Sequence, residues 1–236
     1  VRLPGAFSGF RVAHISDLHN ARFGERQSDL LAAVRAERPD LMAVTGDLVD
    51  RRRFDLAPAL EFIEGALALA PVCYVPGNNE ALSGRSGEVR AALAARGVYT
   101  LFDEATEIFR GGDSIRVLGL RDPQFHEKGM APRVMRRLLQ EWTSRGGFAL
   151  LLSHRPELFG LYRACGVDLA LCGHAHGGQI RLPLVGGLFA PHQGLFPKYT
   201  GGLYEEGGCA MVVSRGLGES LFPMRVGNPP EVVVVT

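Results

Sequence analysis

The sequence has no C-x-x-C pair and no long apolar run, and each absence removes a class of protein. The four cysteines, Cys73, Cys165, Cys172 and Cys209, are scattered along the chain, which argues against a zinc ribbon. We expect them to be buried free thiols, because cysteine packs as a small hydrophobe. No apolar run reaches the ~18 residues that a membrane-spanning helix needs. The sequence therefore indicates a globular protein with its cysteines in the core.

The sequence also lacks an excess of charge of either sign. Lys and Arg number 26 against 25 for Asp and Glu, a formal net charge of +1. No basic stripe is present, so we expect no stable nucleic-acid partner. The basic run at 51–53 is local, and we interpret it as a solvated loop unless that loop borders an anionic site.

The chain organisation predicts one α/β domain spanning residues 1–236, because no repeat, low-complexity tract or linker interrupts it. Short apolar runs rich in β-branched residues predict strands at 10–15, 41–44, 72–75, 98–102, 107–110, 115–120, 148–152, 167–171, 210–214 and 231–235. Amphipathic stretches predict helices at 28–38, 54–70 and 132–145. A glycine-rich turn at 111–113 predicts a hairpin, so the fold is not purely parallel.

Five of the predicted strands end in a short polar group. These groups contain Asp17 and His19, Asp47, Asn78, His154, and His174 and His176. Ligands of open α/β sheets bind beyond the carboxyl ends of the strands, so the groups can converge. A single strand-end Asp or His is more often a turn former or a structural residue. All of them together, with Gly46, Gly77 and Gly173 to allow close backbone approach, indicate one site.

The side-chain types in these groups match a site for divalent metal ions. Carboxylate, imidazole and amide oxygen suit Mn, Fe, Zn, Co or Ni. No thiolate is included, which argues against a structural zinc. In Asp17–His19 and in His174–His176, an extended backbone is expected to put two side chains on the same side. Asp47 is the candidate bridge, since one carboxylate can hold two ions ~3.5–4 Å apart.

The order of these groups carries a resemblance to a known family. The motifs Asp-x-His, Gly-Asp, Gly-Asn-x-Glu, a single His and Gly-His-x-His stand at Asp17–His19, Gly46–Asp47, Gly77–Glu80, His154 and Gly173–His176. In this order they resemble the calcineurin-like metallophosphoesterase superfamily. The sequence around them is similar in particular to the YkuE/YaeI-like bacterial branch.

The resemblance implies a fold, a cofactor and a chemistry. The fold is a four-layer α/β/β/α sandwich with two mixed β-sheets. Two divalent metal ions would support attack on phosphorus by a metal-bound hydroxide. The implied ligands are Asp17, His19 and His176 for the first ion, Asn78, His154 and His174 for the second, and Asp47 for both.

The resemblance also bears on location. Members of this branch often carry an upstream anchor or export signal, and the sequence begins at Val1 rather than Met. We expect the protein to be cytoplasmic or membrane-associated, and export from the cell stays open as an alternative.

The third motif departs from the family at Asn79. The family usually has His there, near the leaving group, and an amide cannot donate a titratable proton. One interpretation is that His192, or next His126, takes over as the catalytic acid. The others are that the substrate has a good leaving group, or that the protein binds metal and turns over poorly.

The segment Gly177–Gly208 predicts a long loop or irregular hairpin that is rich in apolar residues. Either it packs on the domain, or it lines the path of a hydrophobic substrate. The second interpretation predicts a lipid-linked or envelope phosphoester and, with it, peripheral membrane association. Arg181, Lys198 and Arg215 are the candidate phosphate contacts.

The resulting functional hypothesis is a phosphodiesterase or pyrophosphatase that depends on two metal ions. A nuclease or cyclic-nucleotide phosphodiesterase on the same site is an alternative. So is a protein phosphatase, because the stretch GDLVDRR approaches the pattern of that group. From a different class, the chain could be a non-catalytic metal-binding scaffold.

Overall fold

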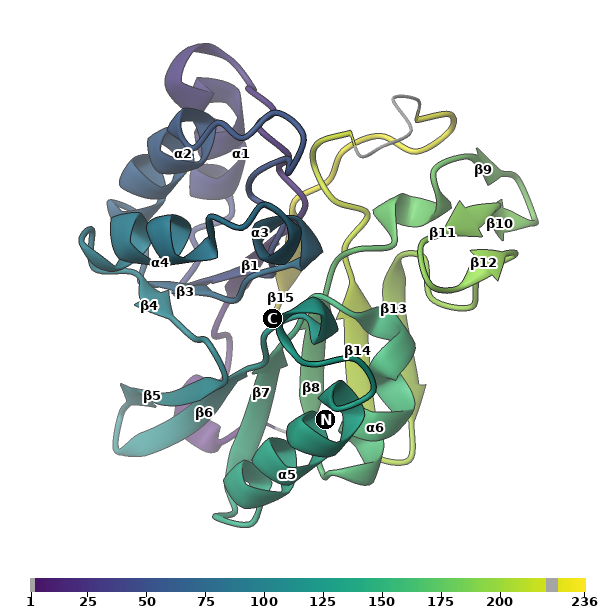
Figure 1. Cartoon of the computed structure of the whole chain (residues 1–236). Coiled ribbons are helices and arrows are strands. Elements are labelled where there is room, and N and C mark those ends of the chain that lie inside the picture. Colours follow the sequence, from purple (N-terminus) through teal and green to yellow (C-terminus); the bar gives the residue numbers. More distant parts are fainter. Residues whose placement is uncertain (1–2, 220–224) are drawn as a thin grey trace.

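The computed structural model describes residues 3–219 and 225–236, and two β-sheets form its centre (Figure 1). The first sheet has the strand order β15-β1-β2-β3-β4. Its strands are β1 (Val12–Ile15), β2 (Leu41–Val44), β3 (Val72–Tyr74), β4 (Tyr99–Thr100) and β15 (Val233–Val235). Strands β1 to β4 run parallel, and β15 pairs with β1 antiparallel.

The second sheet has six strands in the order β13-β14-β8-β7-β6-β5. They are β5 (Glu104–Arg110), β6 (Asp113–Gly119), β7 (Phe148–Leu152), β8 (Leu169–Cys172), β13 (Gly202–Glu206) and β14 (Cys209–Val213). The four inner strands are parallel, while β5 and β13 lie antiparallel at the two edges. Both sheets are therefore mixed.

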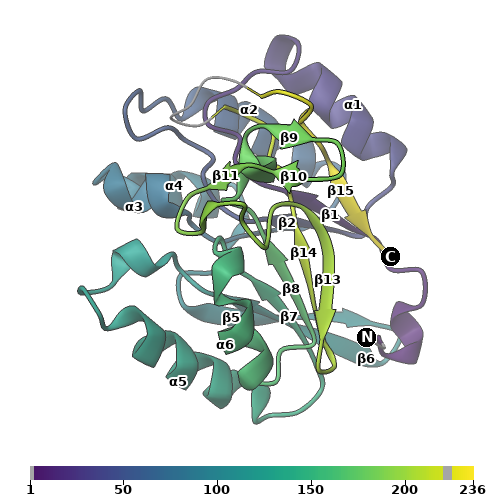
Figure 2. The same cartoon turned by 90° about the vertical axis from the view of Figure 1, so that its right-hand side faces the viewer.

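Helices cover the outer faces of both sheets, as Figure 2 shows. The first sheet carries α1 (Ser28–Ala36), α2 (Ala57–Leu67) and α4 (Ser86–Ala94), and the second carries α5 (Ala131–Thr143) and α6 (Phe159–Ala164). The helices α2 and α5 each have Pro in the first turn, where no N–H partner is lost. The result is the four-layer α/β/β/α sandwich with two mixed sheets that the resemblance implied.

Strand β2 shows how the sequence forms these layers. Leu41 and Ala43 pack between the two sheets, whereas Met42 and Val44 pack under the helices of the first sheet. All four are buried, because the period of two sends alternate side chains to two different cores. A strand buried on both faces reads as a continuous apolar run. This is why the short runs could be recognised in the sequence.

Several short elements complete the fold. They are α3 (Asn78–Leu82), the 3-10 turns Gly5–Phe7, Glu25–Gln27, Pro123–Phe125, Pro156–Leu158 and His176–Gly178, and the strands β9 (Arg181–Leu182), β10 (Gly186–Gly187), β11 (Phe189–Ala190) and β12 (Gly194–Leu195). The last four strands form two small hairpins in the segment predicted as a long loop or irregular hairpin.

The predicted elements agree well with the observed ones. Each run predicted as a strand contains or overlaps an observed strand, and the three predicted helices are present. The four cysteines are buried free thiols, as predicted. No helix within residues 3–219 and 225–236 is long and apolar enough to cross a membrane. Helix α4 was not predicted, because its buried face consists only of Val89 and Leu93.

Candidate metal centre

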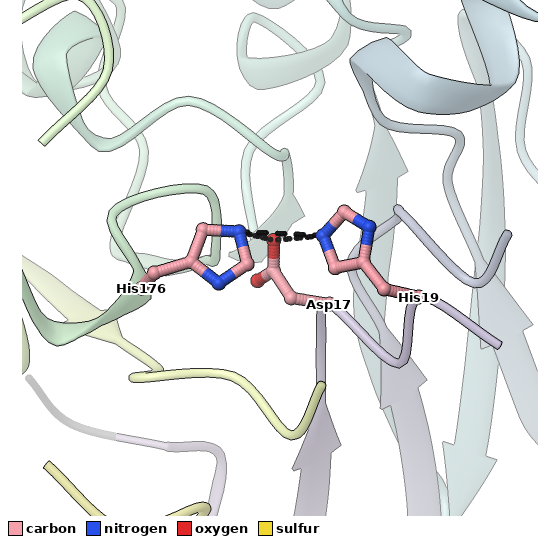
Figure 3. Close-up of side chains that lie close together, drawn as sticks. All are labelled: Asp17, His19 and His176. Atoms are coloured by element: carbon pink, nitrogen blue, oxygen red, sulfur yellow. Dashed lines mark hydrogen bonds and ion pairs between the residues drawn. The ribbon is translucent and has the colours of Figure 1, made fainter. Parts of the chain in front are cut away.

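The loops after β1 in the first sheet and β8 in the second sheet bring three predicted ligands together. Figure 3 shows the side chains of Asp17, His19 and His176 pointing toward one another. Asp17 Oδ1 lies 3.3 Å from His176 Nε2 and 3.7 Å from His19 Nε2. The two imidazole Nε2 atoms are 3.3 Å apart. Residues more than 150 positions apart thus form one buried cluster.

A second group adjoins this cluster through Asp47. Asp47 Oδ2 lies 3.5 Å from His19 Nε2 and 3.3 Å from His154 Nε2. His154 Nε2 is in turn 3.2 Å from His174 Nδ1. Asn78 lines the same pocket, and its Oδ1 is buried with no hydrogen-bond partner in residues 3–219 and 225–236. The structure therefore brings all seven predicted ligands to one place, with Asp47 between the two sets.

The backbone of the ligand segments differs from the predicted extended form. Positive φ angles occur at Asp17 (55°), His19 (46°), Asp47 (53°), His174 (68°) and His176 (46°). The prediction that two extended segments present their side chains by the period of two was wrong. The chain instead turns through left-handed conformations at the sheet edge. Such residues cost on the order of 1–3 kcal/mol each and cluster at functional sites.

The glycines of the motifs are required where the ligand loops approach one another. Gly46 has a φ of 93°, a conformation that side chains rarely adopt. A Cβ at Gly77 would overlap Asp47 Oδ1, and a Cβ at Gly173 would overlap the Ser16 hydroxyl. These contacts confirm the prediction that glycine permits close backbone approach here.

Glu80, the last residue of the third motif, ties two ligand loops together. Its Oε2 accepts the N–H groups of Asp47 (2.9 Å) and Gly77 (2.8 Å). Its Oε1 accepts those of Leu48 (2.7 Å) and Val49 (3.3 Å). Burial and the Asp47 carboxylate raise the pKa of Glu80 to about 7, against the effect of the N–H donors. This carboxyl group fixes where Asp47 stands.

Hydrogen bonds also orient the ligand atoms toward one another. His154 Nδ1 lies 2.7 Å from the Thr45 carbonyl, so Nδ1–H donates there and Nε2 is the nitrogen that faces the cluster. The His174 N–H donates to Asp17 Oδ2 (3.0 Å), while Asp17 Oδ1 is buried with no hydrogen-bond partner among the described residues. Once the imidazoles release their protons, lone pairs on oxygen and nitrogen face one another, as a divalent ion requires.

The spacing of these atoms fits ions as well. Neighbouring ligand atoms of the two sets are 3.2–3.9 Å apart. Ligands around an ion with bonds of about 2.1 Å lie about 3.0–3.4 Å from each other. The residues present therefore fit a divalent metal centre after slight closure of the cluster.

The pKa shifts in the cluster also indicate that the buried carboxylates need positive charge beside them. Burial opposes ionisation, but the carboxylates of Asp47 and Asp17 raise the pKa of His154 to about 10. Against the same burial, His154 and His19 lower the pKa of Asp47 to about 2. Burial alone dominates at His176 and lowers its pKa to about 4. In the absence of metal, protons on imidazole thus balance the buried carboxylates.

Asn79 makes contacts that the sequence did not predict. Its backbone N–H donates to Asp47 Oδ1 (2.7 Å), and its side-chain Nδ2 donates to Asp47 Oδ2 (2.5 Å). Its Oδ1 accepts the Arg51 N–H (3.2 Å). The amide in the place of the family's His therefore holds the carboxylate between the two sets.

Of the two suggested stand-ins for the missing His, the structure places only His192 at the cluster. His192 Nδ1 lies 2.9 Å from His174 Nε2 and 2.5 Å from Arg155 Nη1. Burial and Arg155 lower the pKa of His192. His126 instead lies 3.7 Å from Asp103, and it does not line the pocket over the cluster.

The three predicted phosphate contacts point to other partners. Arg181 donates to the Gly177 carbonyl (2.9 Å), and Arg215 pairs with Glu231 (2.5 Å). The Lys198 ammonium lies 5.0 Å from the centre of a tyrosine ring. None of the three is among the described residues that line the pocket, so their contact with phosphate stays a prediction.

A pocket of about 330 Å³ opens over the ligands, and the basic loop borders it. It is lined by His19, Asp47, Asp50, Arg51, Arg52, Asn78, Asn79, Leu82, Gln124, His174, His176, Pro191 and His192. Arg51 and Arg52 of the basic run therefore border the pocket over the ligands, and the Arg52 guanidinium pairs there with Asp50 (2.9 Å). Sequence reasoning missed the buried Arg155, although it directly follows the predicted ligand His154.

Sequence comparisons relate this chain to a known family. The sequence model of the calcineurin-like phosphoesterase family matches residues 10–178. The metallophosphoesterase YkuE of Bacillus subtilis is 29% identical over 99% of this chain and 81% of its own length. The phosphodiesterase YaeI of Escherichia coli K12 is 30% identical over 96% of this chain and 81% of its own.

Solved structures share the fold. TT1561 of Thermus thermophilus superposes with a TM-score of 0.56 at 14% identity, over 88% of this chain and 89% of that one. The NAD nucleotidase NadN of Haemophilus influenzae gives 0.53 at 14% identity, over 88% and 45%. With the family match, the relatives and the cluster of ligand-type side chains together, the chain belongs to the calcineurin-like phosphoesterases and is a metal-dependent phosphoester hydrolase.

Proposed function

We propose that the chain is a phosphodiesterase or pyrophosphatase that uses two divalent ions. Asp17, His19 and His176 would hold one ion, and Asn78, His154 and His174 the other, with Asp47 shared by both. The observation that carries this proposal is the position of Asp47, whose Oδ2 lies within 3.5 Å of a histidine from each set. One carboxylate between two ligand sets matches a two-metal site.

When bound, such ions supply an activated water and stabilise charge on the phosphoryl oxygens. The residues of the chain have separate tasks around them. Glu80 holds the backbone of Asp47 by accepting its N–H, and Asn79 holds the Asp47 carboxylate by donating two hydrogen bonds to it. Arg51 and Arg52 border the pocket and offer positive charge to the phosphate.

Asn79 already donates to Asp47, so the leaving group needs another donor. His192 lines the pocket next to His174 and is the ring best placed for this task. Hydrogen bonds to a developing negative charge typically contribute about 10²–10³ in rate. We assign His192 to the leaving-group oxygen.

The substrate we propose is lipid-linked, and the protein associates peripherally with a membrane. Exposed large apolar side chains gather in the hairpin region, residues 181–197: Leu182, Leu184, Val185, Phe189, Leu195 and Phe196. Residues 182–197 contain no charged side chain, and Arg181 and Lys198 flank them. Exposed apolar turns with adjacent cations suit a lipid surface. Pro191 and His192 belong to the same region and line the pocket, so a docked lipid would reach the site.

A substrate screen on Mn-loaded protein tests both the proposed reaction and the proposed lipid-linked substrate. We expect turnover of diesters or pyrophosphates, with lipid-linked compounds preferred, and none with Asp47→Ala. A preference for soluble substrates over every lipid-linked diester or pyrophosphate would refute the lipid assignment. Absence of both bound metal and turnover would instead support the scaffold hypothesis.

Vesicle binding tests the surface separately. Leu184→Glu with Phe196→Glu is expected to abolish co-sedimentation with vesicles that contain anionic lipid, while hydrolysis of a soluble aryl diester stays unchanged. Phe109→Glu is the control, because Phe109 is 74% exposed, close to the 69% of Phe196, but lies on β5. Equal losses in the two variants would contradict the docking surface.

A further inference from the structure

Arg155 is a buried cation held in a fixed orientation beside the predicted ligands. Its side chain is only 2% exposed, and Asp122, its main partner, is fully buried. Nε and Nη2 of Arg155 bind the two carboxylate oxygens of Asp122, with Nη2 to Oδ1 at 3.0 Å. Nη1 also reaches Glu157 Oε1 at 3.2 Å. A two-pronged pair of this kind fixes the plane of the guanidinium.

The remaining contacts of Nη1 are with histidine nitrogens. Nη1 lies 2.5 Å from His192 Nδ1 and 3.2 Å from His174 Nε2. A guanidinium can only donate hydrogen bonds, so His192 Nδ1 must be the acceptor. The proton of a neutral His192 ring then resides on Nε2.

His174 lies beside this pair. Its Nδ1 faces His154 Nε2 at 3.2 Å, on the side of the second ligand set, and its Nε2 lies 2.9 Å from His192 Nδ1. An imidazole nitrogen has one lone pair, so the shorter contact, with the Arg155 N–H, takes that of His192 Nδ1. The Nε2–H of His192 is then the donor left for the pocket.

We propose that Arg155 is a positioning residue that holds His192 as the neutral Nε2–H tautomer and aims that N–H at the leaving-group oxygen. This rests on the function proposed above. The P–O bond to the leaving group breaks as the bond from phosphorus to the attacking water oxygen forms. The Nε2–H of His192 stabilises the negative charge on the departing oxygen by a hydrogen bond. His192 keeps its proton, and solvent water protonates the released group.

A purely structural arginine would behave differently. Such an arginine would hold the loop after β7 against the hairpin region, and its loss would slow the hydrolysis of all substrates alike. A positioning role predicts that the effect depends on the leaving group, because a weakly basic oxygen needs little stabilisation. The two roles also differ in whether the tautomer of His192 changes.

The kinetic experiment compares Arg155→Ala, His192→Ala and the double variant on two diesters. With an alkyl leaving group, each single variant is expected to lower kcat about 100–1,000-fold, and with nitrophenol less than about 3-fold. The double variant is expected to be no slower than His192→Ala. Arg163→Ala, which removes an exposed pair with Glu206, is the matched control and should leave both rates unchanged. Equal slowing of both diesters, or multiplied losses in the double variant, would overturn the proposal.

A second readout does not depend on activity. In zinc-loaded protein with ¹⁵N-labelled histidine, two-bond ¹H–¹⁵N correlations identify the protonated nitrogen of each ring. We expect His192 to be an Nε2–H tautomer in the wild type and a mixture in Arg155→Ala. Arg155→Lys, which keeps a donor but cannot bind in the same two-pronged way, should give an intermediate result and replaces the alanine variant if that does not fold. An unchanged tautomer in Arg155→Ala would overturn the proposal even if no substrate is found. Turnover of no diester with a changed tautomer would count against the proposed function alone.

Discussion

Replacing Glu80 by Gln tests how the ligand loops are held. Each carboxylate oxygen of Glu80 accepts two backbone N–H groups, from Asp47 and Gly77 on one side and Leu48 and Val49 on the other. Glutamine keeps the shape but turns one of the two acceptors into a donor. Two buried N–H groups then lose their partner and face another N–H.

The magnitude follows from these two lost bonds. A buried N–H without an acceptor costs about 1–3 kcal/mol, so Glu80→Gln should lower the free energy of unfolding by about 2–6 kcal/mol. That is a large part of the about 5–15 kcal/mol that stabilises a typical domain. The affinity for Mn should also fall, by about 10–100-fold, because Asp47 is no longer fixed by its own N–H.

Urea unfolding of the EDTA-treated protein, followed by circular dichroism, measures the first effect, and calorimetric titration with Mn measures the second. Glu88→Gln is the matched control, since Glu88 on α4 is 49% exposed and pairs with Arg85, which is 50% exposed. An exposed pair contributes about 0.2–1 kcal/mol. If Glu80→Gln costs no more than Glu88→Gln, the carboxylate does not hold the loops and the reasoning is refuted.

Three further predictions concern the metal centre. The raised pKa of His154, about 10, keeps its ring protonated at neutral pH, so metal binding must release a proton. The affinity for Mn should therefore rise from pH 7 toward pH 10. The heat of Mn binding should also vary with the ionisation enthalpy of the buffer. A pH-independent affinity would contradict this. Asn79→Ala removes the Nδ2 bond to Asp47 and should weaken Mn binding about 10–100-fold in the same titration, whereas unchanged binding would show that this bond does not orient the carboxylate. Gly173→Ala puts a Cβ 2.5 Å from Asp17 Oδ2 and should destabilise the protein by about 1–3 kcal/mol. Gly160→Ala in α6, which has open space around it, should not destabilise the protein. Equal urea midpoints for the two variants would disprove the close approach.

The fold was predictable because its central strands are buried on both faces and read as continuous apolar runs. The small hairpins β9–β10 and β11–β12 were not resolved in the prediction, since each strand has only two residues. Too few residues are present to show a period. Their pairing depends on contacts with the rest of the domain.

The sequence by itself determined which side chains occupy the site. Motif order put Asp17, Asp47 and the histidines at the carboxyl ends of parallel strands. The expectation of a single sheet edge was wrong, because these strands belong to two sheets. Only the tertiary structure decided that the carboxyl edges of the two sheets meet, and how the side chains are held. The left-handed ligand backbones, the Asn79–Asp47 bonds and the guanidinium of Arg155 against His192 are set by packing between loops distant in sequence. Periodicity and spacing describe neighbours along the chain, and such contacts join residues that no local pattern connects.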